Sequence, residues 1–198
     1  MNKRKIILCS IISLLCLSVG AINIYALTPT YNGKAEKGVG NTTIYIDSIT
    51  GANYWETYMK SGANNWMYPG WSNPIYITFV SSNYGSTIDF YANDGSLWDG
   101  VGWTVFAETI FYRYGQEFNP IDTNWNWTFS EITLNDTEFR KPTFSNEQAK
   151  GTVIHELGHS FGLQHDNNNR YSIMCQSTSR LVETVQKVDN DAIVAKYQ

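Results

Sequence analysis

The sequence predicts a single α+β domain built on a twisted, mixed β-sheet. A chain of 198 residues with 42% hydrophobic and 15% aromatic residues is long and apolar enough for one buried core. β-Rich runs bounded by Gly- and Asn-containing turns occur at residues 43–48, 75–80, 87–91, 102–112 and 127–135. After the first run, apolar side chains recur at helical spacing at Trp55, Met59, Ala63 and Trp66. Several short strands with few helices favour a mixed sheet over a helical bundle.

Two further helices are expected in the carboxyl-terminal half. Ser145 is a candidate N-cap, and Gln148 three residues later completes a capping box, which predicts a helix through residue 159. Residues 184–197 also look helical, although the stretch 189–191 offers an alternative start. We expect this last helix to pack against the sheet.

The amino terminus resembles a secretory signal peptide. Three basic residues at positions 3–5 precede an apolar run from Ile6 to Val19, and small residues follow. Cleavage after Ala26 or after Ala21 fits equally well. The run is shorter than the ~20 residues that a membrane-spanning helix needs. We therefore expect residues 1–26 to be removed and residues 27–198 to be secreted as one extracellular domain, without stable membrane association.

The net charge limits the expected binding partners, and the cysteine content limits the expected sources of stability. Removal of residues 1–26 leaves 11 of 14 basic residues against 18 acidic ones, a net charge of −7, so nucleic acid is not an expected partner. Cys9 and Cys16 lie in the leader, which leaves Cys175 alone and excludes an intramolecular disulfide. We expect Cys175 to be a small buried apolar residue.

A histidine-rich motif carries the predicted chemistry. Residues 155–165 read His-Glu-Leu-Gly-His-Ser-Phe-Gly-Leu-Gln-His. His155 and His159 are four apart and share one face of a helix, as two ligands of one zinc ion would. His165 lies ~9 Å further along a straight helix, so the helix must stop before it. Gly162 tolerates the left-handed conformation that ends helices and would return His165 to the metal.

This ligand set predicts a catalytic zinc site. Three neutral imidazoles leave one coordination position for water, whose pKa falls towards neutrality on zinc. Glu156 is placed to act on that water as general base, so the implied reaction is hydrolysis of a peptide bond. All three histidines of the chain fall in this motif, so no second His-bound zinc is expected.

The motif resembles that of the metzincin zinc endopeptidases, His-Glu-x-x-His-x-x-Gly-x-x-His followed by a Met-containing turn. Residues 171–175 read Tyr-Ser-Ile-Met-Cys, so Met174 would be the methionine beneath the ligands. Within the metzincins, catalytic-domain size and the lack of disulfides are similar to the matrixins. Asp166 is similar to the reprolysin pattern, but reprolysins are normally disulfide-bonded. Gln176 stands where astacins and serralysins place an additional tyrosine ligand, so four-coordinate zinc is expected.

The resemblance implies a protein or peptide substrate and a monomeric zincin catalytic domain with an active-site helix, a Met-turn and a C-terminal helix. No cysteine lies between the leader and the first strand, so we expect no cysteine-switch propeptide. Calcium is a further expectation without an assigned site, with Asp94 and Asp99 as oxygen donors. The alternative is a catalytically silent, zinc-containing secreted module that binds through surface aromatics among its seven Trp and thirteen Tyr.

Overall fold

The computed structural model describes residues 26–176 and 180–198. The predicted signal peptide therefore lies outside the described residues, apart from Ala26. The elements in chain order are β1 (Thr42–Ile46), η1 (Ala52–Trp55), α1 (Glu56–Met67), β2 (Ile77–Val80), β3 (Ile88–Asn93), η2 (Ser96–Trp98), β4 (Ala107–Arg113), β5 (Gln116–Phe118), β6 (Phe129–Asn135), α2 (Asp136–Phe139), α3 (Asn146–Ser160) and α4 (Lys187–Tyr197).

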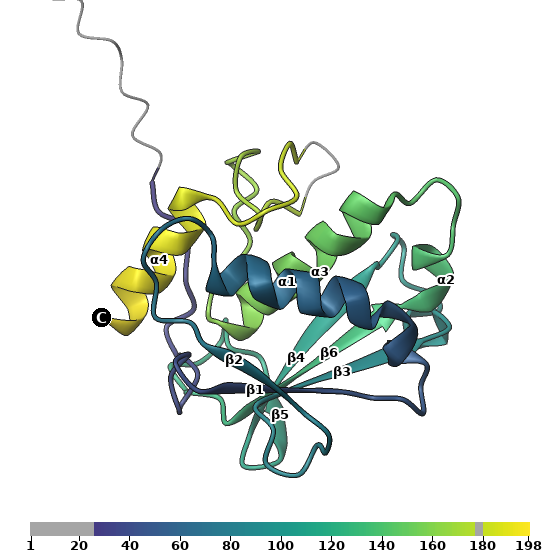
Figure 1. The fold of residues 1–198 in the computed structure, drawn as a ribbon, viewed down its shortest axis with the longest axis horizontal. Coiled ribbons are helices and arrows are strands. Elements are labelled where there is room, and N and C mark those ends of the chain that lie inside the picture. Colours follow the sequence, from purple (N-terminus) through teal and green to yellow (C-terminus); the bar gives the residue numbers. More distant parts are fainter. Residues whose placement is uncertain (1–25, 177–179) are drawn as a thin grey trace, which may run out of the picture.

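The strands form one mixed six-stranded sheet in the order β2-β1-β3-β6-β4-β5 (Figure 1). β1 runs parallel to β2 and β3, and β3 runs parallel to β6. β4 is antiparallel to both of its neighbours, β6 and β5. The predicted α+β class and mixed sheet are therefore confirmed.

Two stretches differ from the expected strands. The run predicted from Gly102 forms a strand only from Ala107; the Val105 and Phe106 carbonyl groups just before it accept hydrogen bonds from the Asn135 side chain and backbone amide, respectively. β5 was not expected, and it follows β4 through a two-residue turn. Both residues of that turn have positive φ, 51° at Tyr114 and 81° at Gly115, as a tight primed hairpin turn requires.

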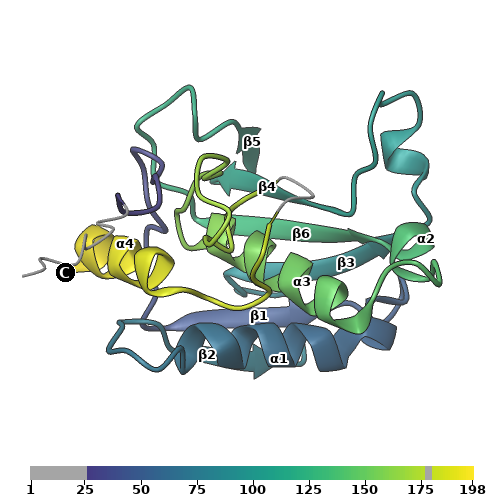
Figure 2. The ribbon, with the colours of Figure 1, turned by 90° about the horizontal axis from the view of Figure 1, so that it is seen from above.

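α1 and α3 lie side by side across one face of the sheet (Figures 1 and 2). Gly62 allows their close approach, because a Cβ atom there would lie 2.8 Å from Cγ1 of Val153 on α3. The indole nitrogen of Trp66 donates to the Ile154 carbonyl oxygen at 2.8 Å. These contacts bury the expected apolar face of α1 against α3 rather than against the sheet alone.

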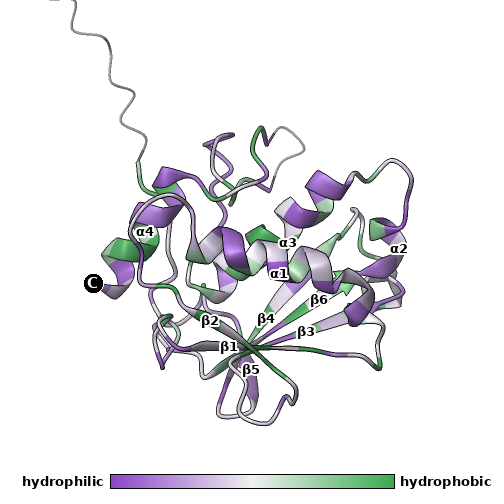
Figure 3. Ribbon diagram, in the orientation of Figure 1, coloured by the Kyte–Doolittle hydropathy of each residue, from purple (hydrophilic) through white to green (hydrophobic). Residues whose placement is uncertain are grey.

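α3 combines a polar beginning with a buried remainder. The first turn of the helix is hydrophilic, and hydrophobic residues follow further along (Figure 3). Every residue from Gly151 to Ser160 is buried. The histidine motif is therefore held on the most enclosed helix of the domain.

α4 begins at Lys187, close to the alternative start that the sequence offered, and Gln186 and Asp189 form a capping box there. The expectation that it packs against the sheet is wrong, because it lies at one end of the molecule (Figures 1 and 2). It contacts the N-terminal segment instead. Lys196 donates to the Tyr31 carbonyl oxygen at 2.6 Å, and the Tyr197 hydroxyl accepts from the Ala35 amide at 3.0 Å. No helix within the described residues is long and apolar enough to cross a membrane.

Substituting Gly62 with leucine should destabilise the domain. The new side chain would overlap Val153 and its neighbours on α3, and overpacking of this kind costs about 1–3 kcal/mol of unfolding free energy. Urea denaturation of the Gly62→Leu variant measures the loss. The matched control is Asn64→Leu on the exposed face of α1, which should change stability by less than about 0.5 kcal/mol. Equal stability of both variants would contradict the close approach at Gly62.

Lys196 should make the domain more stable as the pH rises from 8 to 10. Burial, helped by the positive charge of Lys34, lowers the pKa of Lys196 to about 8. An unfolded lysine titrates near ~10.4, so over this range the unfolded chain binds more protons, and its free energy rises relative to the folded state. The stability difference between wild type and Lys196→Met, measured at several pH values, should grow in favour of wild type. A difference independent of pH would contradict this burial.

Candidate metal centre and active-site cleft

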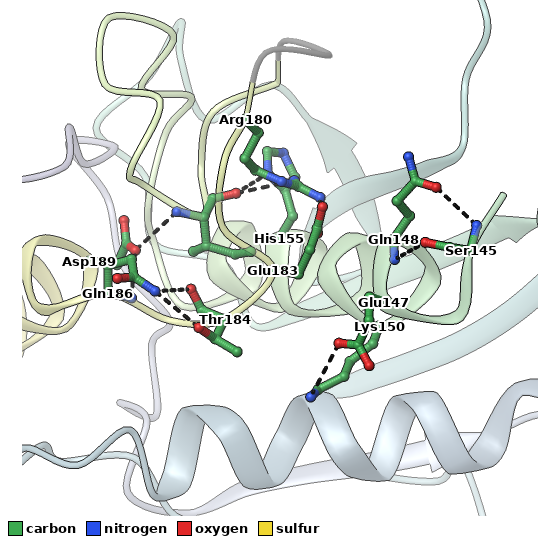
Figure 4. Close-up of polar contacts among 11 residues, drawn as sticks. Ser145, Glu147, Gln148, Lys150, His155, Arg180, Glu183, Thr184, Gln186 and Asp189 are labelled. Atoms are coloured by element: carbon green, nitrogen blue, oxygen red, sulfur yellow. Dashed lines mark hydrogen bonds and ion pairs between the residues drawn. The ribbon is translucent and has the colours of Figure 1, made fainter.

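The helix that carries the motif starts as predicted. The Ser145 hydroxyl accepts from the Gln148 amide at 3.2 Å, and the Ser145 amide donates to the Gln148 side chain at 2.9 Å (Figure 4). This capping box satisfies backbone groups that would otherwise lack partners in the first turn. The start of α3, and with it the direction of the histidines further along the helix, is thereby set.

α3 ends where Gly162 was expected to break it. Gly162 has φ of 105°, its amide donates to the His159 carbonyl at 2.8 Å, and the Leu163 amide donates to the Gly158 carbonyl at 2.9 Å. This pair of bonds is the Schellman pattern of helix termination. The chain then pairs with the N-terminal segment through an antiparallel bridge between Thr30 and Leu163. The segment leading to His165 is therefore held on both sides.

The three histidines converge on one point. Nε2 of His159 lies 3.1 Å from Nε2 of His155 and 3.0 Å from Nε2 of His165. His155 and His159 are buried, whereas His165 is exposed at the edge of the cleft. They are the one group of three or more potential ligands that the described residues bring together. The structure thus joins all three predicted ligands.

The opposite ring nitrogens identify the protonation state. Nδ1 of His155 lies 2.8 Å from the Ile173 carbonyl oxygen, and Nδ1 of His159 lies 2.9 Å from the Leu163 carbonyl oxygen. A carbonyl only accepts, so each Nδ1 carries the proton and each Nε2 presents a lone pair. Burial lowers the pKa of His159 to about 3 and that of His155 well below its usual value. Neutral nitrogen lone pairs this close repel one another unless a cation lies between them, so the residues fit a zinc ion.

Glu156 lies beside the histidines and is held by β4. The Thr109 hydroxyl donates to Oε2 of Glu156 at 2.7 Å and lies 3.2 Å from its backbone oxygen. Burial raises the pKa of Glu156 to about 7 against the opposing effect of this hydrogen bond. Sequence spacing pointed to Glu156 but gave no sign of Thr109, which is 47 residues away.

Met174 packs against the active-site helix between the two helical ligands. It is fully buried, and a Cβ atom at Gly158 would lie 2.4 Å from its sulfur. Gly158, which the sequence motif left unspecified, is therefore needed so that the methionine can approach the helix backbone. Cys175 is buried, as expected.

Asp189 holds the Met-turn from behind. Its carboxylate accepts from the Thr28 hydroxyl at 2.7 Å, the Ser172 hydroxyl at 2.5 Å and the Ile173 amide at 3.1 Å. Since the Ile173 carbonyl binds His155, Asp189 is linked to this predicted ligand through the backbone of a single residue, Ile173. The sequence indicated residues 189–191 only as a helix start, and no local pattern pointed to this role.

An ion pair between Arg180 and Glu183 lies near His155 (Figure 4). Arg180 binds Glu183 at 2.6 Å and also approaches the Ile173 carbonyl at 3.4 Å (Figure 4). Glu183 lies over Gly151 of α3, where any side chain would collide with its carboxylate. The pair is thus built onto the active-site helix.

These groups open into a cleft of about 1500 Å³. One wall comes from β4 and the residues before it, including Trp103, Phe106 and Thr109, and the opposite wall from α3 together with Gln176 and Arg180. The two histidines on the helix, His165 and Glu156 all line it. The cleft is large enough for an extended segment of polypeptide.

The residues considered for calcium do not join a ligand cluster in the described part of the chain. One carboxylate oxygen of Asp94 accepts from the Ser96 amide at 3.1 Å, and its backbone oxygen accepts from Thr137 at 2.6 Å. Asp99 follows η2. This arrangement is that of a side-chain-stabilised turn, so calcium stays a prediction without a site.

Substituting Gly162 with alanine should weaken metal binding. A φ of 105° strains any side-chain-bearing residue, and the added Cβ would lie 2.5 Å from Cε of Lys196. Strain of this kind is on the order of 1–3 kcal/mol, and relief of it would displace His165. Zinc affinity, measured by competition with a chelator, should fall at least about tenfold. Gly102→Ala, where a Cβ meets open space, is the control, and equal affinity of both variants would argue against the helix break as a determinant of the site.

Comparison with known proteins agrees with this geometry. The family model described as Matrixin matches residues 52–198, a range that includes α3, the Met-turn and α4. Comparison with curated proteins gives no match. The matched range covers well over half of the chain and contains all three histidines. The chain therefore belongs to the matrixin family of zinc metallopeptidases.

Proposed function

We propose that this matrixin is a secreted endopeptidase that hydrolyses peptide bonds in extended protein segments, with Glu156 as general base. The observation that carries the proposal is the convergence of three histidine nitrogens beside a buried glutamate inside a large cleft. A bound zinc ion supplies a Lewis acid that lowers the pKa of water and polarises a carbonyl group. His155, His159 and His165 would hold it.

Glu156 is suited to receive and release a proton. Thr109 binds one carboxylate oxygen, and no described residue donates to the other, Oε1. A pKa raised to about 7 by burial makes the protonated carboxyl accessible near neutral pH, while the charge of a metal nearby opposes that rise. Glu156 would take the proton of the attacking water and deliver it to the leaving amine.

The cleft offers backbone as well as side-chain contacts to a substrate. β4 pairs with β6 along its length, but β5 covers its other edge only from Phe111 onward. Residues 107–109, which line the cleft, therefore keep an edge that β5 does not cover. An extended peptide could add to this edge through main-chain hydrogen bonds, which favours substrates in extended conformation over folded ones.

Export and oligomeric state rest on sequence. The basic and apolar leader supports secretion and an extracellular site of action for the domain of residues 27–198. We expect a monomer that meets its protein substrates in solution.

The Glu156→Gln variant tests the mechanism. It keeps the shape of the side chain but removes the base, so hydrolysis of casein should fall at least about 100-fold. Zinc content, measured by atomic absorption, should equal that of wild type, because Glu156 is not a ligand. The matched control is Glu131→Gln on the opposite face of the sheet, which should retain full activity.

The outcomes separate the two functions considered. A Glu156→Gln variant as active as wild type would contradict the role of Glu156. A wild-type protein that binds zinc but leaves casein and unstructured peptides intact would favour the silent binding module instead. Activity that disappears with a chelator and returns with zinc supports the endopeptidase.

A further inference from the structure

Tyr31 places a hydroxyl group beside the metal centre from outside the motif. Its backbone is fixed by the Tyr31 amide, which donates to the Gly162 carbonyl at 3.0 Å. Its ring packs edge-on against Phe111 and Trp127 with centroids 5.4 and 6.1 Å away, and 7% of the residue is exposed. Its hydroxyl oxygen lies 3.2 Å from Nδ1 of His159. The hydroxyl is thus held firmly in one place.

The protonation state of His159 decides what this hydroxyl can do. Nδ1 of His159 already faces the Leu163 carbonyl at 2.9 Å and carries the ring proton, since Nε2 points at the metal position. A protonated nitrogen cannot accept a hydrogen bond. The Tyr31 oxygen can therefore only accept a hydrogen bond from Nδ1, which also donates to the Leu163 carbonyl. The Tyr31 O–H needs a different acceptor.

That O–H group has no other partner among the described residues, and Tyr31 lines the same cleft as Glu156 and the histidines. With the Nδ1 proton of His159 shared at most with its oxygen, the Tyr31 O–H is left as a donor at the wall of the space that a substrate would fill.

We propose that the Tyr31 hydroxyl donates a hydrogen bond to a main-chain carbonyl oxygen of the bound peptide. The inference rests on the proposed peptidase function and names a substrate-binding residue for it. A neutral donor suits a carbonyl oxygen, which every peptide carries, so the contact contributes to binding of the backbone whatever the side chains are. It differs from a role in positioning His159, which the Leu163 carbonyl already fulfils.

A binding experiment tests the donor directly. The probe is a peptide that wild type cleaves, titrated by calorimetry into zinc-loaded Glu156→Gln protein with and without Tyr31→Phe. Loss of one neutral hydrogen bond should weaken peptide binding about 3- to 10-fold. Zinc affinity of the Tyr31→Phe protein, measured by chelator competition, should stay unchanged. The phenylalanine ring keeps the packing against Phe111 and Trp127, so the thermal midpoint should change little.

The control is Tyr197→Phe, a half-buried tyrosine beside the N-terminal segment, whose hydroxyl binds the Ala35 amide and no other group in the described part of the chain. It should leave the Kd for the peptide unchanged. Unchanged peptide binding in Tyr31→Phe would overturn the inference. So would a 10- to 100-fold loss of zinc affinity with normal peptide binding, because that result assigns Tyr31 to ligand positioning. If wild type neither binds nor cleaves any peptide, the proposed peptidase function is contradicted as well. If wild type cleaves peptides normally and Tyr31→Phe binds them equally well, only the role of Tyr31 is contradicted.

Discussion

Convergence of three imidazole nitrogens on one point, with Nε2 of His159 3.1 and 3.0 Å from those of His155 and His165, is the constraint on which the rest of this site depends. Rings converge in this way only when their orientation is fixed from the far side. Two carbonyl oxygens, those of Ile173 and Leu163, fix the rings of His155 and His159 through Nδ1. Each carbonyl belongs to a segment whose position is fixed by contacts outside the histidine motif.

The Leu163 carbonyl depends on the end of α3, where the Gly162 turn and the bridge to Thr30 set its direction. The Ile173 carbonyl depends on Asp189, which binds the amide of the same residue. Burial of Asp189 raises its pKa, while the hydrogen bonds from Ser172 and Thr28 oppose the rise. A buried carboxylate is costly unless several donors surround it, so the Met-turn, the N-terminal segment and α4 must assemble together.

The sequence predicted the parts of the site that are local. The spacing of His155 and His159, the helix break at Gly162 and the capping box at Ser145 each depend on a few neighbouring residues, and all three appear in the structure as expected. Long-range contacts left no such pattern. Thr109 meets Glu156 across 47 residues, and Thr28 meets Asp189 across 161. The unexpected packing of α4 has the same cause, because Thr28, Tyr31 and Ala35, which it contacts, lie at the other end of the chain.

The N-terminal segment is part of the site, because its residues contact the groups that orient the histidines. The family match begins at residue 52, yet Thr28, Thr30 and Tyr31 contact Asp189, Leu163 and His159, respectively. His159 is itself a predicted ligand, Leu163 binds His159 through its carbonyl, and Asp189 reaches His155 through Ile173. Ligand geometry and docking of this segment are therefore energetically linked, since whatever stabilises one stabilises the other. Differences among matrixins in the residues ahead of the first strand would then change metal affinity and substrate binding without any change in the histidine motif.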